Sequence, residues 1–252
     1  MYYPFLLCAL AGLSTSLGAV FVILGGGIND DKMSFYEGFA AGVMLAVSRF
    51  DLIPESYKSY LSYLTRWQGA RAVFLLFLSG VAVGFAMSKF CDTFTFKYSS
   101  RQGQIIGRTA FLTTLIIVLH NLPEGMLTIF TAAKKARFGL KVSRAVALHN
   151  IPEGMAVAGP VLYLSKSKKK AFMQAFWRGM AELFGGFVSY FLLFSFINTA
   201  FLNGIMPFIA GIMCQTAIFE LVPSSMKISK NIHTICGIIS GIIVMSIGIF
   251  LF

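Results

Sequence analysis

Eight long apolar stretches run through this chain, and they restrict its fold more than any other feature. A helix needs roughly 20 apolar residues to cross a hydrocarbon layer of about 30 Å, and short polar loops separate the stretches. The predicted spans are 5–28, 35–57, 71–90, 105–133, 138–163, 171–197, 202–226 and 232–252. We therefore expect an all-α integral membrane protein, an eight-transmembrane-helix bundle that forms one transporter domain over 1–252.

The composition agrees with a lipid environment and excludes other classes of protein. Apolar residues make up 57% of the chain, and it contains 26 phenylalanines. The net charge of +11 needs no nucleic acid, because the basic run 166–170 would lie beside an anionic membrane surface. Basic residues are more numerous in the loops that would be cytoplasmic if the N-terminus is outside. We expect a multi-pass protein of the plasma membrane with that orientation, in contact with the lipid bilayer.

Most of the acidic residues lie where a membrane protein tolerates them least. The chain has ten acids. Among those inside predicted spans are Asp51, Glu55, Glu124, Glu153, Glu182 and Glu220. A carboxylate at the centre of a bilayer costs on the order of 2.5–3.5 kcal/mol even on lenient insertion scales. Either function or strong internal pairing must explain them.

One octapeptide occurs twice, on neighbouring spans. The copies are LHNLPEGM at 119–126 and LHNIPEGM at 148–155. On a helix, His120 lies one turn from Glu124, and His149 lies one turn from Glu153, so each pair shares a face. Such nitrogen and oxygen donors suit zinc, ferrous iron and related divalent ions. The alternative is a hydrogen-bonded network between two helices with no ligand.

Each copy also contains an asparagine, a proline and a glycine. Asn121 and Asn150 add amide oxygens on the same side of each helix. The proline lacks an N–H and releases the carbonyl four residues earlier, which inside a bilayer is tolerated in a protein-lined or water-filled site. Gly125 and Gly154 leave room for something to approach the backbone.

The arrangement of the copies indicates a transporter. The two spans run antiparallel as neighbours, and inverted repeats around a polar site at mid-depth are typical of secondary transporters. A weaker echo relates DLIPE at 51–55 to ELVPS at 220–224. We therefore predict that spans 1–3 and 6–8 are inverted repeats around the central pair, a 3+2+3 arrangement.

Several further residues are candidates for the transport route. Met44, Ser48, Asp51 and Glu55 form one polar stripe along the second span, and Glu220 lies in the seventh. Local pairing, with Arg49 as an available partner, explains the acids of the second span equally well.

Two further assignments also have an alternative in which the residue has only a structural role. Glu182 would contact metal or form a salt bridge with Arg178, one turn earlier. Met44 alone is more often a packing residue than a ligand.

With these motifs in view, the chain resembles the ZIP family of divalent metal transporters, most closely compact members with H-N-x-P-E-G in the fourth and fifth spans. The resemblance implies a binuclear metal centre, an elevator-like or rocking movement of two helix groups, and commonly a homodimer. The implied ligands are His120, Asn121, Glu124, His149, Asn150, Glu153, Glu182 and Met44. Unlike many relatives, the loop between the third and fourth spans contains no histidine.

The function predicted from these residues is transport of a divalent transition metal, zinc or ferrous iron, into the cytoplasm. The metal is substrate, and no cofactor and no catalytic residue are expected. Because protonated imidazole and carboxylate groups cannot coordinate metal, uptake should weaken as pH falls. The rival hypothesis is an intramembrane metallohydrolase, although the chain contains no H-E-x-x-H helix.

Overall fold

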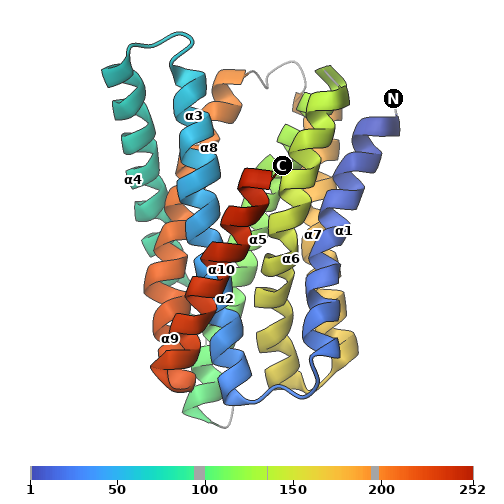
Figure 1. Ribbon diagram of the computed structural model, residues 1–252, viewed down its shortest axis with the longest axis vertical. Helices are drawn as coiled ribbons and strands as arrows, with labels where there is room; N and C mark the ends of the chain where they lie inside the picture. Colours follow the sequence, from blue (N-terminus) through green and yellow to red (C-terminus); the bar gives the residue numbers. More distant parts are fainter. Residues whose placement is uncertain (1, 94–99, 135, 194–198, 252) are drawn as a thin grey trace.

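The computed structural model describes residues 2–93, 100–134, 136–193 and 199–251, and within them the chain is helical (Figure 1). Long helical rods lie side by side, and three of them contain a short π-helical segment. The elements are α1 (Tyr2–Leu24), α2 (Asp30–Val47), η1 (Ser48–Leu52), α3 (Ile53–Tyr60), α4 (Arg66–Cys91), α5 (Arg101–Lys134), α6 (Ala136–Ser165), α7 (Lys168–Val188), η2 (Ser189–Leu193), α8 (Thr199–Thr216), η3 (Ala217–Leu221), α9 (Val222–Ile228) and α10 (Asn231–Leu251).

The described part of each predicted span falls mainly on one rod, because α2, η1 and α3 form one rod and α8, η3 and α9 another. Residues 194–197 and 252 of the predicted spans lie outside the described residues. Among the described residues, five helical stretches are long and apolar enough to cross a membrane. They are Tyr2–Leu24, Arg66–Cys91, Gly103–Ala133, Gly204–Ile228 and Asn231–Phe250. The rods that contain α2, α6 and α7 carry more charged residues. The protein is thus an all-α membrane bundle, and the count of eight spans stays a prediction.

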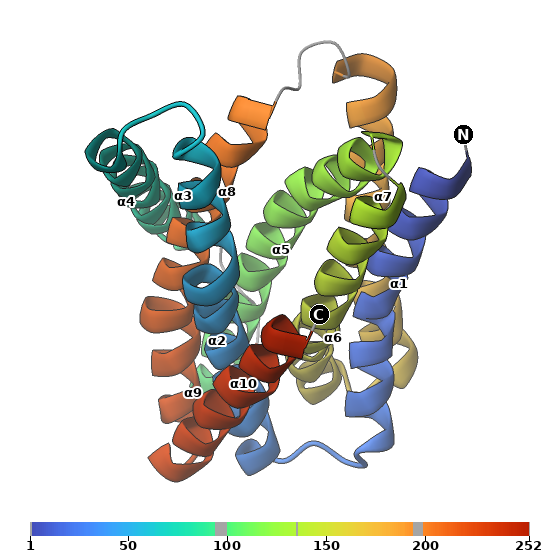
Figure 2. The ribbon, with the colours of Figure 1, turned by 45° about the horizontal axis from the view of Figure 1, so that its top comes forward.

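The rods form two groups, which Figure 2 separates. We call α1, α5, α6 and α7 the motif bundle, because α5 and α6 carry the two octapeptides. The support bundle comprises the rod of α2, η1 and α3, the rod of α8, η3 and α9, and helices α4 and α10. We call the end that holds the N-terminus the upper end and the opposite end, where α1 connects to α2, the lower end (Figure 1).

Glycines determine how closely the helices of the motif bundle approach each other. A Cβ atom added to Gly154 on α6 would collide with the carbonyl oxygen of Thr15 on α1. The same change at Gly125 on α5 would meet the carbonyl oxygen of Glu182 on α7. What approaches the backbone at these glycines is therefore a neighbouring helix, and close small-residue contacts of this kind are typical of packing in membranes.

The support bundle contains an inverted repeat that is longer than the echo at 51–55 and 220–224. The sequence FAAGVM at 39–44 precedes DLIPE by the same number of residues as FIAGIM at 208–213 precedes ELVPS. In both copies a π-helical segment follows, and a proline stands at the second position of the next helix. The two rods run in opposite directions (Figure 1). The echo thus belongs to a real structural repeat.

The proline of each copy accounts for the π-helical segment. Pro54 and Pro223 have no N–H to donate to the carbonyl four residues earlier. The preceding N–H instead bonds five residues back, from Ile53 to Ser48 in one copy and from Val222 to Ala217 in the other. Such single π-turns inside α-helices occur often at functional sites.

Candidate metal site

The two octapeptides meet as a pair of crossed hydrogen bonds. Nε2 of His120 lies 3.0 Å from Oε1 of Glu153, and Nε2 of His149 lies 3.1 Å from Oε1 of Glu124. Each histidine of one helix therefore contacts the glutamate of the other. All four side chains are buried, with at most 2% of each residue exposed. We call these four residues the crossed pairs.

Several atoms around the crossed pairs have no hydrogen-bond partner within the described residues. They are Nδ1 of both histidines, Oε2 of both glutamates and Oδ1 of Asn121 and Asn150. No group of three or more His, Cys, Asp or Glu side chains in the described part of the chain is already arranged to hold a metal ion. A cation placed here would have to replace the crossed hydrogen bonds.

Glu182 lies next to the crossed pairs and is held by an asparagine. Nδ2 of Asn150 donates to Oε2 of Glu182 at 2.7 Å and to the carbonyl oxygen of Ala11 at 2.9 Å. The salt bridge with Arg178, offered as an alternative, is wrong: Nε and Nη1 of Arg178 have no partner among the described residues. The second amide, Asn121, donates to the carbonyl oxygen of Arg178 at 3.4 Å. Nothing in the structure explains the buried guanidinium.

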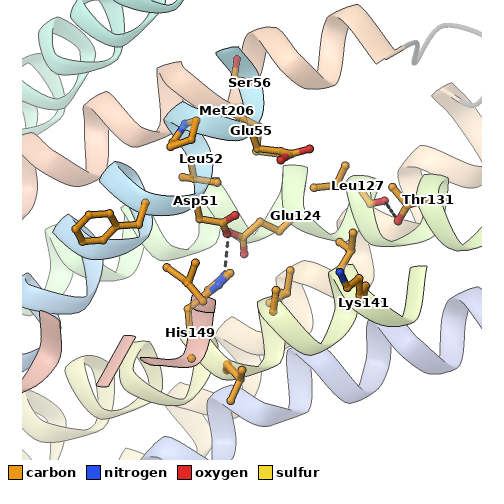
Figure 3. Close-up of a pocket in the computed structure, with 18 of the residues that line it drawn as sticks. Asp51, Leu52, Glu55, Ser56, Glu124, Leu127, Thr131, Lys141, His149 and Met206 are labelled. Carbon is orange, nitrogen blue, oxygen red and sulfur yellow. Dashed lines mark hydrogen bonds and ion pairs between the residues drawn. The ribbon is translucent and has the colours of Figure 1, made fainter. Parts of the chain in front are cut away.

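A cavity of about 700 Å³ reaches one of the crossed pairs from the upper end. Glu124 and His149 line its inner part, and Asp51 points toward them (Figure 3). Its lining also includes Lys58 and Lys141, which are exposed near the upper ends of their helices. The cavity therefore connects the pair formed by Glu124 and His149 with the upper surface.

The predicted route residues separate into those that line this cavity and those that do not. Asp51 and Glu55 line it. Ser48 is buried and donates to the carbonyl oxygen of Ala210 at 3.4 Å. Met44 is fully buried in the apolar core, away from the cavity lining. The structure thus brings two of the four stripe residues to the cavity and leaves the other two in packing positions.

Arg49 is not the partner of the two acids in the cavity. Its side chain is exposed, and its guanidinium carbon lies 5.9 Å from the centre of the Phe50 ring. This contact has the geometry of a cation–π interaction. The positive charge beside the predicted route therefore faces away from it.

Glu220 lies apart from the upper cavity, in an ionic cluster of the lower half. It accepts hydrogen bonds from Arg108 and Ser88. Nε of Arg108 also lies 2.6 Å from Oδ1 of Asp92. Because Arg108 belongs to α5 and its partners to the support bundle, this cluster joins the two bundles. Arg108 is not among the residues singled out from the sequence, although it lies near the start of the predicted span 105–133.

Two further contacts close the lower end between the bundles. Tyr163 of α6 donates to Oδ1 of Asp30 of α2 at 2.7 Å. Met33, Ile106 and Ile228 form a small apolar cluster that again joins α5 to the support bundle. The described residues therefore show a cavity at the upper end and a closed seam at the lower end.

Several known proteins resemble this chain over nearly its whole length. A family model described as ZIP zinc transporter matches residues 97–248. The chain is 35% identical to the zinc transporter ZupT of Enterobacter sp. (strain 638) over 100% of this chain and 97% of the relative. It is 30% identical to ZupT of Chlorobium chlorochromatii, over 99% and 97%, and 31% identical to ZupT of Streptococcus mutans, over 100% and 98%. The chain therefore belongs to the ZIP zinc transporter family, and it is a membrane transporter rather than an enzyme.

Proposed function

We propose that this protein carries zinc into the cytoplasm and binds it at the crossed pairs. The proposal is based on the composition and position of these pairs. Two buried imidazoles and two buried carboxylates meet at the end of an open cavity. Neutral imidazole and carboxylate are good zinc ligands. A divalent cation that replaced the crossed hydrogen bonds would compensate the buried negative charge, which is costly in hydrocarbon.

The twofold arrangement supports a binuclear site. Glu124 and Glu153 each have a second oxygen without a partner, so each carboxylate can bridge two ions. Glu182 and the amide oxygens of Asn121 and Asn150 lie beside them as further oxygen ligands. The same donors accept ferrous iron, which we propose as a second substrate.

The proposed route of the metal follows from the cavity at the upper end and the closed seam at the lower end. Metal enters from the upper end past Glu55 and Asp51, which attract a cation into the cavity. We infer that the upper end faces outward across the plasma membrane, so that the N-terminus is outside. Release then requires the lower seam to open, through a movement of the motif bundle against the support bundle. Glu220 is the inverted-repeat counterpart of Asp51 and would meet metal on the lower side.

We also propose that the protein works as a homodimer.

Zinc transport itself can be tested with purified protein in lipid vesicles that contain a fluorescent zinc chelator. We expect zinc added outside to enter far faster than in protein-free vesicles, and ferrous iron to compete with it. If zinc entry equals that of protein-free vesicles, the proposal is wrong.

The ionic cluster of Arg108 is expected to hold the lower seam closed. Replacing Arg108 by Gln removes its contacts with Glu220 and Asp92. Partly exposed ion pairs are worth up to about 1 kcal/mol, so the population open at the lower end should rise roughly fivefold.

The opening can be measured by the reactivity of a cysteine placed at Met33, which is buried in the lower seam. The native cysteines would first be replaced. A faster reaction with a small thiol reagent in Arg108→Gln supports the role of the cluster. Lys89→Gln, which changes an exposed lysine near the same end of α4, is the matched control. Equal rates in Arg108→Gln and this control would contradict it.

A further inference from the structure

Glu37 is a buried acid that the transport site described above does not use. It lies in the lower half of α2 and only 1% of it is exposed. Neither carboxylate oxygen accepts a well-formed hydrogen bond within the described residues, and the neighbouring hydroxyl of Ser224 on α9 lies close enough for only a weak one. Buried polar groups are normally paired, and a carboxylate left unpaired in a membrane protein is costly. The burial of the Glu37 carboxylate therefore requires an explanation.

The position of Glu37 on α2 continues the polar stripe toward the lower end. Glu37 and Met44 are spaced by seven residues, or about two helical turns, so they lie on nearly the same face of α2. Asp51 follows seven residues later in the π-helical segment and lines the upper cavity. Along the helix axis Glu37 lies roughly 21 Å below Asp51, at 1.5 Å per residue.

The inverted repeat gives Glu37 a counterpart whose position is informative. When Asp51 is matched with Glu220, Glu37 is matched with Met206, because each lies fourteen residues earlier. Met206 lines the upper cavity (Figure 3). In a fold whose repeats are inverted, the matched position lies at the opposite end. Glu37 would therefore line the cavity that forms when the lower seam opens.

We propose that Glu37 binds the divalent cation transiently on its way out at the lower end, as a second site beyond the crossed pairs. The proposal rests on the transport function proposed above. A single carboxylate with a hydroxyl beside it provides hard oxygen donors without a full ligand set. Such a site holds an ion weakly enough to release it, which conduction along a route requires. Methionine at the matched position shows that the repeat itself does not need an acid there.

The test compares Glu37→Gln and Glu37→Asp with the wild-type protein in vesicles, together with zinc binding to the purified protein. We expect Glu37→Gln to bind zinc at the crossed pairs as the wild type does, while the maximal rate of zinc uptake falls at least tenfold. Glu37→Asp keeps the carboxylate and should recover much of that rate. Ser34→Ala is the matched control, because it removes a buried polar group of the same helix that bonds only inside the support bundle.

Each outcome bears on the proposal. Wild-type uptake by Glu37→Gln overturns it, and so does a Glu37→Asp variant as slow as Glu37→Gln, since the acid would then act through packing. Loss of zinc binding together with uptake in Glu37→Gln also overturns it. Failure of the transport function is distinguishable, because it would appear as absent zinc uptake by the wild-type protein.

Discussion

Replacing Glu124 and Glu153 together by alanine is expected to lower zinc uptake at least a hundredfold. Both carboxylates are buried, and each is bonded to the histidine of the other helix. Their loss removes every negative charge from the crossed pairs and leaves two imidazoles that cannot together hold a zinc ion at the usual four-coordinate site. Zinc binding to the purified protein should fall in parallel, because the same groups bind and carry the metal.

The double variant needs a control for folding, since each histidine loses a buried partner at a cost of about 1–3 kcal/mol. Glu124→Gln with Glu153→Gln keeps the size of both side chains and should be equally inactive. Asp31→Ala, which removes an exposed carboxylate, should transport as the wild type does. A monodisperse double variant with unchanged zinc uptake would show that the crossed pairs are only a structural network.

The second large effect is expected from one methyl group at Gly154. In Gly154→Ala the new Cβ atom would collide with the carbonyl oxygen of Thr15, so α1 and α6 must separate. Overpacking of this kind costs typically 1–3 kcal/mol, and here it opposes backbone rather than a flexible side chain. We expect the midpoint of thermal unfolding to fall by roughly 5–10 °C.

Gly159→Ala on the same helix is the matched control for Gly154→Ala. Its added Cβ atom would lie 3.7 Å from the nearest atoms, those of Tyr36, which is ordinary contact. Thermal unfolding followed by fluorescence in detergent would compare the two variants. Similar midpoints would mean that the close approach of α1 and α6 does not matter for stability.

Much of the fold was readable from the sequence, because apolar length predicts helices in lipid directly. Within the described residues, each predicted span lies mainly on one helical rod. The similarity of DLIPE and ELVPS indicates only part of the repeat, and the preceding FAAGVM and FIAGIM carry the stronger signal. The π-helical segments were not predicted, although Pro54 and Pro223 are their physical cause.

The pairing at the site could not be derived from helical periodicity. Spacing of four residues places His120 near Glu124, whereas the structure pairs each histidine with the glutamate of the neighbouring helix. That choice depends on how α5 and α6 are aligned, and backbone contacts at glycines with α7 and α1 help to fix the two helices. The same limit applies to Glu182, whose partner is Asn150 rather than the residue one turn earlier.

The inverted repeat also bears on how readily the protein changes conformation. If one packing pattern serves both ends, the helices lose few contacts when the roles of the ends are exchanged. The energy difference between the outward-open and inward-open states is then determined largely by positions where the two copies differ, such as Glu37 against Met206. Single substitutions at such mismatched positions could then shift the resting state without altering the crossed pairs, where we propose that the ion binds.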